Sequence, residues 1–304
     1  VYGFLNIMFK ILEEEKPDHL AVAFDLKEPT FSHKMYADYK GTRKPMPEEL
    51  REQVPLMKEV LAAMGVPILT MAGYEADDIL GTIAKRCQAE GEEVSVVSGD
   101  RDLLQLADTH IKIRIPKTSR GTTEIHDYYP EDVKREYQVT PTEFIDVKAL
   151  MGDTSDNIPG VPSIGEKTAT NLIVAYGSIE NAYAHLDEVK PPRAKKALEE
   201  HYELAVMSKE LAEICITCPI PFEYEEAKLE NLYTPEAYQY MKRLEFKSIL
   251  ARFDVQDMGG NSVEEHFWSV EDLSGAEQIF EKAKTAEQVG CQLILSETGV
   301  AGLA

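Results

Sequence analysis

Cysteine is scarce in this 304-residue chain, which has four in all. Four cysteines do not make the disulfide framework on which small secreted domains depend, and Cys87 and Cys291 lie far from the one close pair, Cys215 and Cys218. That pair has the spacing of half a zinc site but no second pair, so we interpret it as structural or incidental. The cysteine content therefore favours a protein of the reducing cytoplasm.

Long apolar runs are also missing. The apolar stretch at the start, residues 1–12, is interrupted by Asn6 and Lys10 and has no signal-peptide cleavage pattern. The chain starts with Val1 and has helical spacing from its first residues, so we expect it to be a fragment. With 43% hydrophobic and 28% charged residues, the composition is that of a folded soluble protein with no membrane partner.

Positive charge is in short supply as well. The chain has 32 Lys and Arg against 54 Asp and Glu, a net charge of −22, which at first argues against nucleic acid as a partner. Residues 201–304, with 19 acids and 8 bases, carry half of this excess. If eight acids of the first 200 residues form one metal-binding cluster, the rest of that region has a net charge of only −3. Total charge therefore does not exclude DNA.

Short apolar runs alternate with helical patterns over the first 140 residues. The expected strands are 20–24, 66–69, 94–97 and 111–115, and the clearest helices between them are 48–64 and 75–89. This alternation predicts an α/β fold with a Rossmann-like, mostly parallel sheet and helices on both faces. Such sheets bind ligands at the carboxyl ends of their strands.

The remainder of the chain has a mainly helical pattern. Helices are expected at 142–151, 166–176, 178–185 and 193–211. We therefore predict an α/β core at 1–140, a helical subdomain at 141–256, a linker at 257–262, and the truncated start of a further domain at 263–304.

Carboxylates end two of the expected strands. Asp25 follows the run 20–24, and Asp100 follows the run 94–97, with Asp102 two residues later. A single Asp in this place most often caps the next helix, so neither position carries much weight alone.

Two further acidic elements lie near helix ends. Glu75, Asp77 and Asp78 crowd the start of one helix; the helix dipole favours acids there, but three together repel one another. Asp153 and Asp156 lie on a turn between helices, where capping alone is an equally good explanation.

The four acidic elements can converge at one edge of the sheet. A site made only of oxygen ligands, without a His or Cys cluster, suits a hard cation such as Mg²⁺ or Mn²⁺. Two such ions can activate a water and stabilise the leaving oxygen in phosphodiester cleavage. The sequence therefore predicts a two-metal site.

A glycine-rich turn follows the last acidic element. Residues 160–169, GVPSIGEKTA, place glycines before a helix start, where backbone N–H groups and the helix dipole attract a phosphate, and Lys167 adds a cation. This pattern is typical of a grip on the DNA backbone. The alternative is a plain helix-turn-helix corner in a core.

Six short motifs occur in this order: FD at 24–25, YKGTR at 39–43, GYEADD at 73–78, SGDRD at 98–102, GDTSDN at 152–157 and GVPSIGEKTA at 160–169. In order and spacing they resemble the 5′-nuclease domains of bacterial DNA polymerases of type I, which belong to the flap endonuclease family. The likeness covers residues 1 to about 255. It implies a PIN-like nuclease core, a helical arch near residues 31–51 through which single-stranded 5′ ends pass, and a helix-hairpin-helix element that grips duplex DNA.

By position, the resemblance implies metal ligation by eight carboxylates. Asp25, Glu75, Asp77 and Asp100 correspond to the residues nearest the metals. The other four correspond to the remaining metal-site carboxylates, some of which act through water: Asp78, Asp102, Asp153 and Asp156.

The resemblance also implies DNA contacts. Lys40 and Arg43 correspond to arch residues that steer the scissile phosphate in catalysis, and Tyr39 is expected to contact DNA beside them. The DNA-gripping turn, which in this family also holds a monovalent cation such as K⁺, corresponds to Gly160, Val161, Ser163, Ile164, Gly165, Lys167 and Thr168.

Two departures from the family pattern stand out. The family opens with a strand that ends in another metal-binding Asp, and this strand would lie upstream of Val1, so we expect the 304-residue chain alone to be poorly folded and inactive. Residues 291–304 resemble the first strand of a proofreading domain, in which Asp-x-Glu carries the activity. Here Leu295, Ser296 and Glu297 stand instead, which predicts a disabled proofreading site.

We therefore expect a monomeric, metal-dependent 5′–3′ exonuclease or flap endonuclease that removes 5′ flaps and RNA primers. It would act in the cytoplasm, near the nucleoid, with a polymerase domain in cis. Two alternatives stay open. A DNA-junction module could hold duplex DNA without cutting it, and an unrelated Mg²⁺ phosphohydrolase would explain the carboxylates but not the turn at 160–167.

Overall fold

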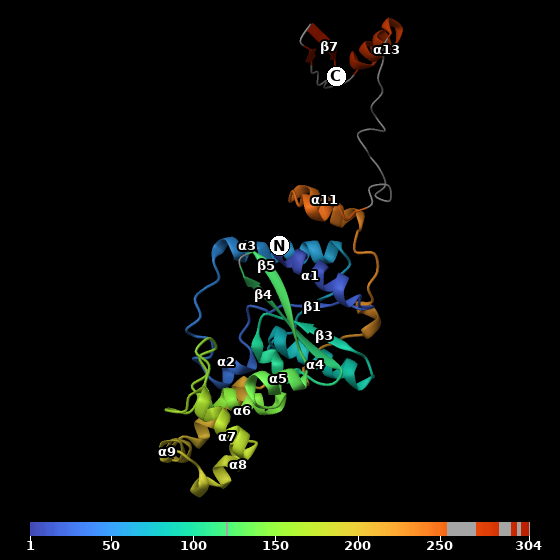
Figure 1. Cartoon of the computed structure of the whole chain (residues 1–304). Helices are drawn as coiled ribbons and strands as arrows, with labels where there is room; N and C mark the ends of the chain where they lie inside the picture. Colours follow the sequence, from blue (N-terminus) through green and yellow to red (C-terminus); the bar gives the residue numbers. More distant parts are fainter. Residues whose placement is uncertain (120, 254–271, 286–292, 297–298, 304) are drawn as a thin grey trace. The chain divides into compact units, whose positions relative to one another are not determined.

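The computed structural model describes residues 1–119, 121–253, 272–285, 293–296 and 299–303 (Figure 1). The chain divides into two compact units, Val1–Phe253 and Asp254–Ala304. Among the described residues no helix is both long and apolar enough to span a membrane.

The strands of the first unit form two hydrogen-bonded sets. β1 (Val22–Ala23) pairs in parallel with β2 (Ile68–Leu69). β3 (Val94–Val97) pairs in parallel with β4 (Ile111–Ser119), which pairs in turn with the antiparallel β5 (Thr122–Tyr128). The four strands expected from the sequence are present. β3 has the expected bounds, and β1, β2 and β4 differ from the expected ranges only at their ends. The sequence did not predict β5, whose side chains are mostly exposed.

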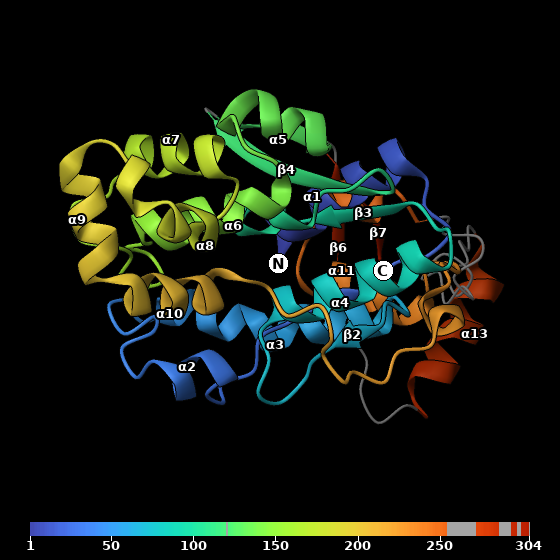
Figure 2. The ribbon, with the colours of Figure 1, turned by 90° about the horizontal axis from the view of Figure 1, so that it is seen from below.

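Helices cover both faces of these strands. Side chains alternate across a strand, so Ser95 and Val96 of β3 point to opposite faces. Ser95 donates a hydrogen bond to Glu15 at the end of α1 (Tyr2–Glu15). Val96 lies in the same core cluster as Ala84 of α4 (Ala76–Ala89). The α/β class with helices on both faces is therefore confirmed (Figure 2).

Two further helices belong to the first 64 residues. α2 (Phe31–Met35) is short, and α3 (Glu48–Ala63) packs against β2. Between α2 and α3 the chain passes through the turn that holds Tyr39 and Lys40. This stretch lies within residues 31–51, the region for which an arch was expected.

From residue 130 onward the first unit is mainly helical. Its helices are α5 (Pro130–Tyr137), α6 (Pro141–Met151), α7 (Glu166–Tyr176), α8 (Ile179–Ala184), α9 (Pro192–Glu200), α10 (Tyr202–Ala212), α11 (Pro235–Arg243) and α12 (Lys247–Leu250). Three short 3-10 helices lie at Arg101–Leu106 (η1), Leu186–Glu188 (η2) and Tyr224–Ala227 (η3). The single helix expected over 193–211 was wrong: the backbone leaves the helical conformation at His201 (φ −129°, ψ 28°), which divides α9 from α10.

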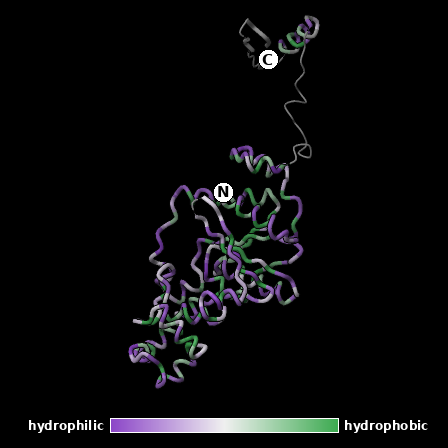
Figure 3. Tube along the Cα trace, in the orientation of Figure 1, coloured by the Kyte–Doolittle hydropathy of each residue, from purple (hydrophilic) through white to green (hydrophobic). Residues whose placement is uncertain are grey.

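One apolar core joins the strands to these helices. It contains Val96 and Ile113 from the strands together with Leu150, Leu172 and Leu198 from α6, α7 and α9. Figure 3 shows hydrophobic positions recurring along the strands and hydrophilic positions along α9. Because the strands and helices share this core, the hairpin at 160–168 is fixed relative to the strand ends.

The described residues of the second unit form one helix and two strands. α13 spans Leu273–Ala283, and β6 (Leu293–Ser296) pairs antiparallel with β7 (Gly299–Leu303). Leu295 and Ser296 of the expected proofreading-like motif lie in β6. Glu297 and the expected linker at 257–262 lie outside the described residues.

Candidate metal and nucleic-acid site

The first half of the site is built where β1 ends and α4 begins. Asp25 lies two residues beyond β1, and its Oδ1 accepts a hydrogen bond from the Ala76 N–H (2.8 Å). Glu75 is the N-cap residue of α4, and its own N–H donates to Asp78 Oδ2 (2.9 Å). These acids therefore do act as caps, as the simpler interpretation of the sequence allowed.

Asp78 and Asp77 differ in how their charge is stabilised. Asp78 is buried, and its Oδ1 accepts a second backbone N–H, from Cys215 (2.9 Å). Burial raises the pKa of Asp78, and the two backbone N–H groups oppose the rise. For Asp77, burial and the nearby negative charges of Asp100 and Asp25 raise the pKa to about 7. Negative charge is thus in excess around Asp77.

The second half of the site begins after β3. Asp100 is the N-cap residue of η1 and accepts a hydrogen bond from the Asp102 N–H (2.9 Å). Asp102 forms an ion pair with Lys148, which also lies 2.7 Å from Asp153 Oδ2. Burial raises the pKa of Asp102 to about 6, although Lys148 acts against the rise. Burial would raise the pKa of Asp153 too, but hydrogen bonds from Lys148 and Ser155 outweigh it and hold that pKa below its usual range.

Lys148 is the site residue that the sequence interpretation missed. Only 5% of it is exposed, which is rare for a lysine without a charged partner. A signal was present in the sequence: Lys148 is a lone cation in the otherwise apolar end of α6, between Val147 and Ala149 and five residues before Asp153. Nothing in the local pattern, however, indicates that Asp102 lies within reach.

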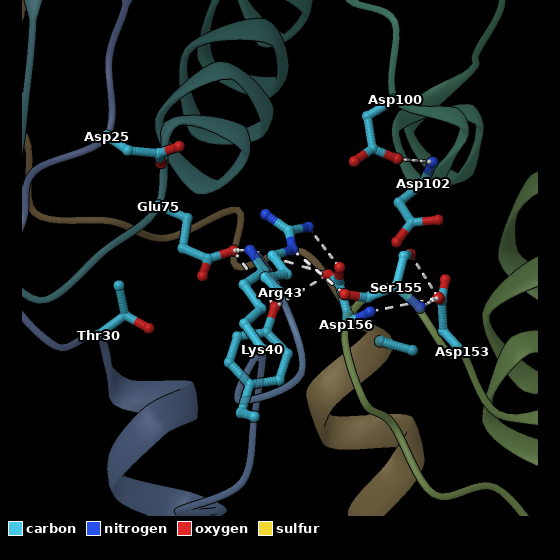
Figure 4. A network of polar contacts seen from close by, with 12 residues as sticks. Asp25, Thr30, Lys40, Arg43, Glu75, Asp100, Asp102, Asp153, Ser155 and Asp156 are labelled. Carbon is cyan, nitrogen blue, oxygen red and sulfur yellow. Dashed lines mark hydrogen bonds and ion pairs between the residues drawn. The ribbon is translucent and has the colours of Figure 1, made fainter. Parts of the chain in front are cut away.

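Cations from the segment after α2 reach across to both halves (Figure 4). Lys40 Nζ lies 2.6 Å from Glu75 Oε2 and 3.8 Å from Asp156 Oδ2. Arg43 forms an ion pair with Asp156 and donates through Nε to the Ser155 carbonyl (3.2 Å). The structure therefore brings both predicted phosphate-steering residues to the carboxylates.

Tyr39 contacts the same two acids as these cations. It is 5% exposed, and its hydroxyl donates to Glu75 Oε2 (3.3 Å) and Asp156 Oδ2 (3.4 Å). Burial, with the negative charge of the same two acids, raises the pKa of Tyr39, so the phenol keeps its proton. Tyr39 thus links two carboxylates that come from separate parts of the chain.

Several of these side chains line one small cleft. Five acids line it, together with Tyr39, two residues of α2 and the segment at the end of α10: Glu75, Asp77, Asp78, Asp102, Asp156, Tyr39, Phe31, Ser32 and residues 211–214. Asp25, Asp100 and Asp153 adjoin this group through the contacts described above. Within the described residues, no three His, Cys, Asp or Glu side chains already form a set that could hold a metal ion.

The donor chemistry nevertheless fits a divalent cation. Every candidate ligand is a carboxylate oxygen, which suits Mg²⁺ or Mn²⁺. The raised pKa of Asp77 reports negative charge that the protein does not itself neutralise, and a bound cation would do so. The negative charges of Asp100, Asp25 and Glu75 all act to raise the pKa of Asp77, so the four acids predicted to lie nearest the metals are electrostatically coupled.

The glycine-rich turn follows the second half directly. Gly160 and Ser163 have positive φ angles of 65° and 72°. A Cβ at Gly160 would lie 2.4 Å from the Gly152 nitrogen, so only glycine fits there. Val161 and Ile164 are buried in the core, so they anchor the turn, and only their backbone could contact DNA.

The outer side of the turn offers groups to a phosphate. α7 begins at Glu166 after the N-cap residue Gly165, and no side chain caps it. Lys167 is exposed and Thr168 is half-buried. The hydroxyl of Ser163 accepts a hydrogen bond from Arg193 of α9 (3.0 Å), a contact that the sequence did not predict. The N–H groups of Gly160, Val161, Ile164 and Thr168 already donate within the protein, so the turn offers a phosphate the cation Lys167 and the N-terminal end of α7.

Several relatives and solved structures are similar to the chain. DNA polymerase I of Bacillus caldotenax is 45% identical over 84% of this chain and 29% of its own length, and DNA polymerase I of Bacillus subtilis is 43% identical over 90% of this chain and 30% of its own length. The chain thus spans about 30% of these relatives.

Among solved structures, a bacteriophage T5 5′-exonuclease with bound zinc has a TM-score of 0.60, at 21% identity over 80% of this chain and 89% of its own. A bacteriophage T5 flap endonuclease in complex with DNA and metal ions has a TM-score of 0.59, at 20% identity over 82% of this chain and 88% of its own. At this identity the likeness shows the fold.

Two family models match the chain in succession. Residues 1–138 match the 5′–3′ exonuclease N-terminal resolvase-like domain, and residues 139–234 match the 5′–3′ exonuclease C-terminal SAM fold. Together they cover the strands of the first unit, the candidate carboxylates and the glycine-rich turn. The chain belongs to the 5′–3′ exonuclease family.

Proposed function

We propose that this chain is the 5′-nuclease part of a DNA polymerase I and hydrolyses phosphodiester bonds at 5′ flaps and RNA primers. One observation carries the proposal. Lys40 and Arg43, from a segment outside the sheet, form ion pairs with Glu75 at the start of α4 and Asp156 on the turn after α6. Cations that suit a phosphate therefore contact two of the acids that line the cleft. The relatives named DNA polymerase I and the family models support it.

The residues of the cleft would divide the work. Bound divalent cations would supply the charge that activates water and stabilises the leaving oxygen. Lys40 and Arg43 would release their carboxylate partners and neutralise the scissile phosphate. The turn at 160–168 would hold the duplex through its backbone, independently of base sequence.

We extend the proposal to the cofactors and partners. The cleft would take two ions, Mg²⁺ or Mn²⁺, and the turn at 160–168 would take K⁺. The protein would act as a monomer on flapped, nicked or primed duplexes, in the cytoplasm near the nucleoid, with a polymerase domain in cis. The similarity to polymerase relatives supports the polymerase domain in cis, and the oxygen-only donors support a hard divalent cation.

A labelled 5′ flap tests the proposal. The chain, and any longer natural form of it, is incubated with the flap and Mg²⁺, and the products are sized. Release of the flap at the junction supports the nuclease. A gel shift without cleavage would instead support a DNA-junction module. If the protein neither cuts nor binds the flap, the unrelated phosphohydrolase is the remaining alternative. EDTA serves as the control, since it must stop cleavage.

A further inference from the structure

The turn between α6 and the hairpin is closed on itself. Asp153 and Ile158 exchange backbone hydrogen bonds, from the Asp153 N–H to the Ile158 carbonyl (2.9 Å) and back (2.8 Å). Gly160 packs against Gly152, and its N–H donates to Ser208 Oγ (3.1 Å) on α10. Because both ends are fixed to buried helices, the turn at 152–158 has a defined position in the unit.

This turn holds the segment that carries Lys40. The side-chain amide of Asn157 donates to the Asp38 carbonyl (2.7 Å), and the Lys40 N–H donates to the Asp156 carbonyl (2.8 Å). Asn157 itself has a left-handed backbone (φ 55°), a conformation that Asn adopts more readily than most residues. Asn157 thus adopts the left-handed backbone of the turn and also donates a side-chain hydrogen bond to Asp38.

The Asp38 carbonyl is the point on which the Lys40 turn closes. It accepts the Gly41 N–H (2.9 Å) as well as the Asn157 amide, so two donors occupy it. Lys40 between them has a positive φ of 55°. A displaced Asp38 carbonyl would therefore displace the Lys40 backbone and change the reach of its side chain toward Glu75.

We propose that Asn157 is a positioning residue that fixes Lys40 over the carboxylate cleft and ties it to the DNA-gripping turn. The inference rests on the proposed nuclease function. Asn157 stands three residues before Gly160, so the same rigid turn carries the backbone grip in one direction and orients Lys40 in the other. Asn157 itself touches neither the carboxylates nor, in this account, the DNA. Its loss should lower turnover and leave DNA binding intact.

Asn157→Gly is the variant of choice because glycine keeps the left-handed backbone and removes only the amide. We expect kcat for flap cleavage to fall about tenfold to a hundredfold, since a misplacement of about 1 Å can cost that much. Flap affinity in EDTA should stay within about twofold. The matched control is Gln138→Gly, which replaces a residue that also has a positive φ (67°) but does not line the cleft, and it should leave kcat unchanged.

A second background separates positioning from general damage. If Asn157 acts through Lys40, then Asn157→Gly should cost nothing more in a Lys40→Ala protein. An equal further loss in that background, or a raised KM with unchanged kcat, would overturn the proposal.

A structural readout covers the case in which no form of the protein cuts flaps. Amide hydrogen exchange at residues 36–43 should speed up in Asn157→Gly, while exchange at 160–168 stays the same. If the wild type fails to cut, the nuclease proposal falls, and exchange still decides whether Asn157 holds the Lys40 turn. Unchanged exchange at 36–43 would refute that role.

Discussion

The two halves of the carboxylate site handle the same chemical problem in different ways. Around Asp102 and Asp153 the protein supplies its own cation, because buried Lys148 pairs with both. Around Asp77 the nearby cation, Lys40, is paired with Glu75, and burial together with repulsion from Asp100 and Asp25 outweighs its effect and raises the pKa of Asp77 to about 7. The comparison indicates that the Asp77 half is where an external cation would gain most, because in the other half Lys148 already offsets part of the charge of Asp102 and Asp153.

Neutralising Asp77 should have the largest effect on flap cleavage. In Asp77→Asn we expect flap cleavage to fall by at least about a thousandfold, because metal ligation is lost. Flap binding should be retained, because the phosphate meets less repulsion. Single-turnover cleavage and flap affinity are measured side by side. Asp187→Asn, an exposed acid paired with Lys195 away from the cleft, is the control. Cleavage that survives in Asp77→Asn would show that this acid is not needed.

Removing Lys148 should leave uncompensated negative charge in the second half, as there is around Asp77 in the first. Lys148→Met leaves Asp102 and Asp153 without their shared cation, and breaking a buried pair in this way costs about 3–5 kcal/mol of unfolding free energy. Urea unfolding measures it at neutral pH. Lys148→Arg keeps the charge and should lose less. A Met variant as stable as the wild type would show that Lys148 contributes no net stability.

The raised pKa of Asp77 should make the stability of the metal-free protein fall as pH rises. The folded pKa of Asp77, about 7, lies above its unfolded value near 3.9, so its contribution to stability is fully present below about pH 4 and is lost as pH rises to about 7. Without metal, the loss should be on the order of a few kcal/mol. Urea unfolding at pH 5 and pH 8 measures it, and Asp77→Asn should show a smaller loss. Equal losses in both proteins would argue against the raised pKa.

A change in the hairpin should leave both halves untouched. Lys167→Ala should weaken duplex binding uniformly across base sequences and reduce the slope of log affinity against log salt by about one. Fluorescence anisotropy over a salt series measures this, with Lys195→Ala, a lysine already paired with Asp187, as the control. An effect confined to one base sequence would show that Lys167 is not a backbone contact.

Much of the fold could be predicted from local sequence patterns. β3 and α7 have the predicted bounds, because Val94–Val97 is a short apolar run and α7 lies between Gly165 and Gly177. β5 could not be predicted in this way, since its exposed, polar side chains carry no strand period. The break at His201 was equally hidden, because neither glycine nor proline marks it and apolar residues continue on both sides.

For the candidate site, the sequence predicts which residues belong to it but not how they contact one another. The motifs identified the acids, and the resemblance suggested their roles. What they could not show is which acids are paired. The contacts of Lys148 with Asp102 and of Asn157 with Asp38 join residues 46 and 119 positions apart, and such contacts depend on how the core packs.

Metal titration by calorimetry tests most directly the claim that the Asp77 half needs an external cation. Mn²⁺ is titrated into the wild type and Asp77→Asn at pH 6.5, in buffers of different ionisation enthalpy, so that proton release is measured along with binding. The account predicts that wild type binds Mn²⁺ and releases protons, because Asp77 must lose its proton to become a ligand, whereas Asp77→Asn binds more weakly and releases fewer. Equal binding and equal proton release by the two proteins would contradict it.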